Sequence, residues 1–66
     1  MITLNEIHDS LINGQRRQMV EQIKEYGLYD FWSDYLNFLQ HTYVNTESHL
    51  TYYSDAVISY HHIENR

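Results

Sequence analysis

Three residues near the C-terminus, Asp55, Ser59 and His62, are the residue types of a nucleophilic triad. Their spacings of four and three would place them along one side of a helix. A triad also needs an oxyanion hole and a walled pocket around the nucleophile. A chain of 66 residues has little interior to spare for a pocket of roughly 300 Å3. The sequence therefore predicts a protein without catalytic activity.

Five histidines raise the question of a metal site. His61 and His62 are adjacent and would point in different directions from a helix. No two histidines are four residues apart, the spacing at which one helix face can hold zinc. The chain also lacks cysteine, and so lacks the thiolates of most structural zinc sites. We therefore expect no metal and no other cofactor, and we interpret the histidines as solvated or capping side chains near helix ends.

Acidic residues outnumber basic ones by nine to four, which gives a formal net charge of −5. This balance argues against direct nucleic-acid binding, because such binding depends on neutralising phosphates with lysine and arginine. Acidic surfaces instead orient encounters with basic protein partners. From Leu28 onward the acids face only one basic residue, Arg66. We therefore predict that Asp30, Asp34 and Asp55 orient a partner, with mimicry of nucleic acid as one way of doing so.

The basic patch of the chain is Arg16 and Arg17, flanked by two glutamines. On a recognition helix these arginines could contact phosphates or bases, with Asn13-Gly14 as the preceding turn. A dimer would present two copies of the patch. A small dimeric DNA-binding regulator is therefore the alternative function.

The ten aromatic residues are the strongest indication in the sequence of which side chains form the core and which bind a partner. Trp32, Tyr35 and Tyr53 lie at spacings that can fill a core, whereas Phe38 and Tyr52 fall off the main apolar stripes. Exposed aromatics commonly mark protein interfaces, where they dominate the binding energy. The residues predicted as anchors for a partner are Trp32, Phe38, Tyr52 and Tyr53.

The positions of caps and glycines predict short helices separated by turns. Thr3 and Glu6 form a capping box ahead of an apolar pattern at helical spacing. The pattern changes phase near Gly14, which predicts a bend or a short turn there. A second helix should run from about Gln15 to Tyr26 and end in a Schellman motif at Gly27.

A third helix should be capped by Asp30, and a fourth should follow the polar turn that begins at Asn45. Leu50, Tyr53 and Val57 recur at spacings of three and four, so we choose helix over strand there, although β-formers are frequent. The last residues, from about His62, should fray. The predicted fold is all-α, a small bundle of three to four short helices in a single helical domain over residues 1–66.

A domain of this length has a thin core and usually needs a staple or a partner. With no cysteine for disulfides, a homo-oligomer, most simply a homodimer, is expected. The longest apolar runs are too short to span a membrane, and the first residues lack the pattern of a secretory signal. These features predict a cytoplasmic protein.

The stretch from Ser10 to Ile23, followed by Tyr26-Gly27 and Asp30-Phe31-Trp32, resembles small proteins encoded by bacteriophages and prophages. The resemblance covers about the first half of the chain. It implies an accessory factor that binds and disables a host protein or protein–nucleic-acid complex, including defence systems such as CRISPR–Cas. The leading hypothesis is therefore a phage-encoded inhibitor that occludes a partner surface, of the anti-CRISPR kind, in the bacterial host cytoplasm. A DNA-binding regulator and a self-assembling structural protein remain the alternatives.

Overall fold

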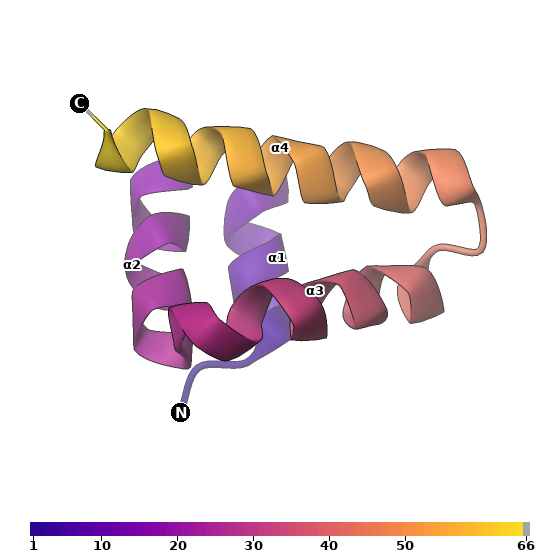
Figure 1. The fold of residues 1–66 in the computed structure, drawn as a ribbon, viewed down its shortest axis with the longest axis horizontal. Helices are drawn as coiled ribbons and strands as arrows, with labels where there is room; N and C mark the ends of the chain where they lie inside the picture. The colour runs from indigo at the N-terminus through magenta and orange to yellow at the C-terminus, as the bar shows by residue number, and fades with distance from the viewer. Residues whose placement is uncertain (66) are drawn as a thin grey trace.

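The computed structural model describes residues 1–65, which form four helices (Figure 1). They are α1 (Leu4–Ile12), α2 (Arg16–Tyr26), α3 (Leu28–Thr42) and α4 (Thr46–Glu64). Helices α3 and α4 pack side by side and antiparallel, whereas α1 and α2 cross them at a steep angle. The predicted small all-α bundle is confirmed, and the segment rich in β-formers is helical as expected.

Helix α1 begins at the predicted cap and ends at the first glycine. The backbone N–H of Glu6 donates to Thr3 Oγ1 at 3.3 Å, as in a capping box. After Asn13, Gly14 takes a φ of +76°. The N–H of Gly14 donates to the Leu11 carbonyl, and the N–H of Gln15 donates to the Ser10 carbonyl. This pair of bonds is a Schellman motif, so the predicted break is confirmed.

The second glycine makes a different turn from the one predicted. Gly27 ends α2 as expected, but its φ of +118° and ψ of 111° lie outside the left-handed helical region that a Schellman motif requires. Helix α3 starts at once at Leu28, and the carbonyl of Gly27 accepts from the N–H groups of Asp30 and Phe31. The prediction that Asp30 caps α3 is therefore wrong, because Gly27 alone separates the two helices and Asp30 falls inside the first turn of α3.

Helix α4 is capped by Asn45, whose Oδ1 accepts from the N–H of Glu47 at 2.7 Å. Fraying from about His62 was expected, yet the helix continues to Glu64. The carboxylate of Glu64 lies 2.9 Å from the amino group of Lys24 on α2. This ion pair joins the last turn of α4 to a neighbouring helix, a contact that local sequence could not reveal.

One core cluster draws on all four helices. Helix α3 contributes Phe31, Tyr35 and Leu39, each completely buried, at successive spacings of four. The other members are Ile7, Leu11, Met19, Val20, Ile23, Ala56 and Tyr60. Within residues 1–65, no helix is both long and apolar enough to cross a bilayer.

Candidate functional site

The residues predicted to bind a partner do not share one surface. Trp32 and Tyr53 lie between α3 and α4, and Phe38 and Tyr52 surround a buried histidine. The acids divide as well: Asp30 and Asp34 lie along one side of α3, whereas Asp55 lies on α4 beside Arg16. Each of these groups has a distinct environment.

Trp32 and Tyr53 help to close the seam between α3 and α4. Their ring centroids are 5.9 Å apart in an edge-to-face arrangement, and Tyr60 packs against Trp32 in the same way at 5.8 Å. Both predicted anchors are half-buried and pack on the core. Such aromatic pairs contribute more to stability than the burial of their surface area alone. Trp32 and Tyr53 therefore stabilise the packing of α3 against α4.

The buried histidine is His8, which is only 5 % exposed. Its Nδ1 lies 2.8 Å from the Tyr35 hydroxyl and its Nε2 lies 2.8 Å from the Tyr43 hydroxyl. The rings of Phe38 and Tyr52 pack against the imidazole, with centroids 5.6 and 5.1 Å away. Phe38 and Tyr52 are therefore half-buried around His8, and the expectation that both are exposed off-stripe aromatics is wrong.

The interpretation of all five histidines as solvated or capping is also wrong. His8 and His49 are buried, whereas His41, His61 and His62 are exposed. His8 follows Ile7 on the inner side of α1, where two tyrosine hydroxyls satisfy both ring nitrogens. Burial lowers the pKa of His8 below its ordinary value, and the carboxylate of Asp9 opposes this shift. His8 is therefore uncharged at neutral pH.

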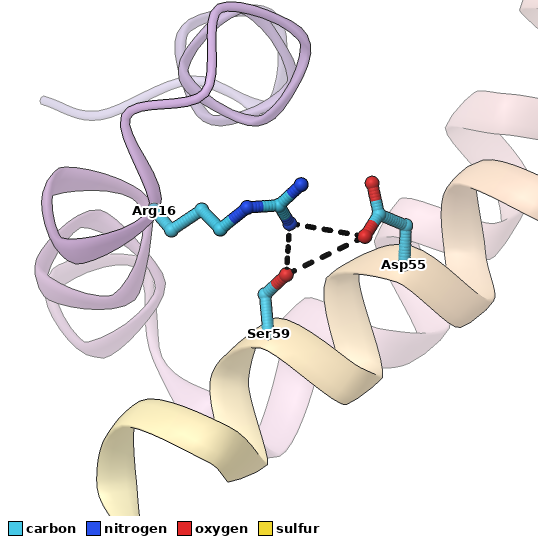
Figure 2. A network of polar contacts seen from close by, with 3 residues as sticks. All are labelled: Arg16, Asp55 and Ser59. Atoms are coloured by element: carbon cyan, nitrogen blue, oxygen red, sulfur yellow. Dashed lines mark hydrogen bonds and ion pairs between the residues drawn. The ribbon is translucent and has the colours of Figure 1, made fainter.

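Asp55 and Ser59 do lie side by side, but their partner is an arginine (Figure 2). Arg16 Nη1 donates to Asp55 Oδ1 at 3.0 Å and also to Ser59 Oγ. A guanidinium cannot accept a proton in a protein, so Arg16 does not take the place of the histidine of a triad, and the Ser59 hydroxyl donates to Asp55 Oδ1 at 3.5 Å. His62, the third of the triad residue types, is exposed and lines a depression together with Arg16, Asp55 and Ser59.

This network joins two residues that the sequence assigned to different partners. Asp55 was predicted to orient a protein, and Arg16 was predicted, with Arg17, to contact DNA. Their side chains remain 42 % and 44 % exposed, and ion pairs this accessible contribute at most about 1 kcal/mol. The pairing nevertheless neutralises Arg16 and leaves Arg17 as the exposed cation of that patch, which weakens the case for DNA binding.

Asp30 and Asp34, in contrast, line an open depression where the N-terminal residues meet the junction of α2 and α3. The depression has a volume of about 410 Å3. Its walls are Met1, Ile2, Glu25, Tyr26, Asp30 and Asp34. Three of these six residues are acidic, and Met1, Ile2 and Tyr26 provide apolar surface.

A second depression of about 410 Å3 continues along α3. It is lined by Leu4, Tyr26, Asp34, Asn37, Phe38, His41 and Thr42. Tyr26 and Asp34 belong to both depressions, and the Tyr26 hydroxyl donates to Asp34 Oδ2 at 2.7 Å. We call the two depressions together the α3 groove.

The α3 groove is acidic at one end and more neutral at the other. Among the residues that the structure describes, no lysine or arginine lines it. Lys24, next to Glu25 in the chain, is held by Glu64 on α4. The hydrogen bond to the Asp34 carboxylate raises the pKa of Tyr26, so this tyrosine stays protonated as a donor.

The α3 groove unites Asp30, Asp34 and Phe38 of the predicted binding residues. Sequence reasoning missed the opposite wall, which is built by Ile2, Leu4, Glu25 and Tyr26. No sequence signal marks this wall, because it forms only when the N-terminal segment and the end of α2 pack beside α3.

Two further observations bear on what the chain could be. Across residues 1–65, no three histidine, aspartate or glutamate side chains gather closely enough to hold one metal ion together. Comparisons with protein-family models, with curated proteins and with solved structures found no match to this chain.

Proposed function

We propose that this chain binds a protein partner in the α3 groove and covers a functional surface of that partner. The observation that carries the proposal is the composition of the groove, which combines apolar surface with three carboxylates and no lysine or arginine among the described residues. A partner segment that fits it carries lysine or arginine beside apolar side chains. Opposite charges across an interface orient and speed association.

The dimensions of the groove suit a short segment. Its walls follow α3 from Asp30 to Thr42, a length of roughly 18 Å at 1.5 Å per helical residue. This length accommodates about 12 residues of a partner helix, or about five residues of an extended strand. An amphipathic helix lying in a groove is a recurrent mode of recognition.

The resemblance of the N-terminal half to small phage proteins supports a host protein as the partner and inhibition as the outcome. The basic surfaces of nucleic-acid-binding proteins, defence nucleases included, offer the required lysine and arginine. On this proposal the chain acts in the host cytoplasm and needs no cofactor. Its thin core and its exposed apolar side chains, Leu50 and Ile58 among them, also support a homo-oligomer.

The proposal can be tested with a set of three baits in lysate of a candidate bacterial host. The first bait is the unchanged chain, the second carries Asp30→Arg in the groove, and the third carries Glu21→Arg. Asp30 and Glu21 are both exposed acids on helices, and Glu21 does not line the groove. Bound proteins are identified by mass spectrometry, and affinities are then measured with the purified partner.

We expect the unchanged and Glu21→Arg chains to capture the same host protein, and the Asp30→Arg chain to bind it at least about tenfold more weakly, which is about 1.4 kcal/mol. Adding the unchanged protein should also inhibit the partner's activity. Equal capture by all three baits would show that the partner does not bind in the α3 groove. Capture without inhibition would contradict the proposed occlusion.

A further inference from the structure

His8 joins three parts of the bundle through one side chain. It projects from α1 and contacts the hydroxyls of Tyr35 on α3 and Tyr43 at the end of α3, each at 2.8 Å. The ring of Tyr52, on α4, packs edge-to-face against it at 5.1 Å. The imidazole is thus the polar centre of an otherwise aromatic cluster.

The hydrogen bonds of His8 depend on its charge. A neutral imidazole has one N–H donor and one acceptor nitrogen, so one tyrosine donates to it and the other accepts. A protonated imidazole donates from both nitrogens, and the tyrosine that had donated must turn its hydroxyl hydrogen elsewhere. Tyr35 is completely buried, and the bond to His8 is the one that the structure records for its hydroxyl.

The groups around His8 compensate poorly for a positive charge. Asp9 follows His8 on α1 and is exposed. Tyr35, Tyr43 and Tyr52 face the ring from the other elements and are neutral, and His49 lies against the Tyr43 carbonyl at 3.4 Å. A buried charge without a close partner of opposite sign is costly. Protonation therefore opposes the packing of α1 on α3 and α4.

We propose that protonation of His8 loosens α1 from α3 and separates the two walls of the α3 groove at Leu4 and Phe38, so that mild acid weakens partner binding. Leu4 on α1 and Phe38 on α3 line the same depression, and Phe38 also packs on His8. The effect on binding rests on the proposed function, whereas the loosening of α1 does not.

The direction of the pH effect follows from linkage. The pKa of His8 is lowered in the folded chain, so the loosened state binds a proton more readily than the packed state. The packed state is fully favoured above the ordinary histidine pKa of about 6.5 and loses stability as the pH falls below that value. The equilibrium shifts by at most tenfold per pH unit, the limit for one proton.

The experiment is an NMR titration of the histidine side chains from about pH 7.5 to about pH 5, a range in which ordinary carboxylates stay charged. Amide hydrogen exchange is followed in parallel. We expect His8 to titrate below about 6.5, and we expect the protection factors of α1 amides, which correct for the intrinsic pH dependence of exchange, to fall over the same interval. A His8 that titrates at or above 6.5, or unchanged protection factors in α1, would overturn the inference.

Two matched variants separate His8 from its neighbours. His41 lines the groove itself and could repel a basic partner once charged, so His41→Gln serves as the control for His8→Gln. We expect the acid-induced loss of protection in α1 and the acid-sensitive binding of the captured partner to persist in His41→Gln and to vanish in His8→Gln. Loss of sensitivity in His41→Gln alone would contradict the role of His8. If His8 titrates and α1 loosens as expected but no partner binds at any pH, the proposed function fails, whereas the loosening of α1 by protonation of His8 is upheld.

Discussion

Tyr29 and Tyr52 are identical side chains in opposite environments. Tyr29, in the first turn of α3, is completely exposed, whereas Tyr52 is half-buried against His8. Phe38 is half-buried beside the same histidine. For a single residue, the exposed fraction thus depends on neighbouring side chains from other helices. The change in the free energy of unfolding caused by a substitution should depend on the same neighbours.

We predict that Phe38→Ala and Tyr52→Ala each lower the free energy of unfolding by about 2 kcal/mol, below the 3–5 kcal/mol typical of fully buried aromatics. Tyr29→Ala should change it by less than about 0.5 kcal/mol, because it removes no packing. Urea denaturation followed by circular dichroism measures all three. A Phe38→Ala chain as stable as the Tyr29→Ala chain would show that Phe38 is free for a partner and that the cluster around His8 is not structural.

The two glycines set how the helices connect. Gly14 has a φ of +76° and closes α1, whereas Gly27, with a φ of +118°, is the single residue between α2 and α3, which meet at a steep angle. A Cβ added at either position would meet no atom within 4 Å. The cost of a side chain at these positions is therefore a property of the backbone alone.

At the scale of the elements, we predict that Gly27→Ala destabilises the fold by about 2 kcal/mol, and Gly14→Ala by about 1 kcal/mol. The order follows because alanine can enter the left-handed region near Gly14 at moderate cost, whereas the backbone of Gly27 lies farther from any conformation that alanine favours. Thermal unfolding of both variants measures which one is less stable. Gly14→Asn serves as a control, because asparagine tolerates the left-handed region. A smaller loss at Gly27 than at Gly14 would contradict the expected order.

In the whole molecule, some acidic residues form ion pairs between helices and others do not. Arg16 and Lys24 each pair with an acid on α4, Asp55 and Glu64, whereas no lysine or arginine is among the described residues that line the α3 groove. Leu50 and Ile58 are exposed on α4, 50 % and 66 % respectively. A small core with exposed apolar side chains is consistent with the expected self-association.

We predict that the melting temperature rises with protein concentration, by roughly 5 °C for each tenfold increase, because a homodimer is stabilised by mass action. Calorimetry over a range of concentrations, with sedimentation velocity as the direct measure of mass, tests this prediction. A melting temperature independent of concentration, together with a monomer mass, would show that the bundle is stable without a second copy.

Local sequence signals specify the helices of this chain. Thr3, Gly14 and Asn45 act through bonds to residues a few positions away, and apolar spacings of three and four act through the period of the helix. Such signals are local, so they predicted the all-α class and the break at Gly14. The prediction of a Schellman motif at Gly27 was wrong because glycine can adopt more than one positive-φ conformation. Local sequence does not say which of these conformations the packing of α3 requires.

The contacts between side chains of different helices depend on tertiary packing. Tyr35 and Tyr43 lie 27 and 35 residues from His8, and Asp55 lies 39 residues from Arg16. No periodicity within one helix encodes such pairs, because they depend on how two helices are oriented against each other. For the same reason the sequence could predict acids and aromatics as binding residues, but only the packing of the N-terminal residues and α2 beside α3 grouped Asp30, Asp34 and Phe38 into one groove.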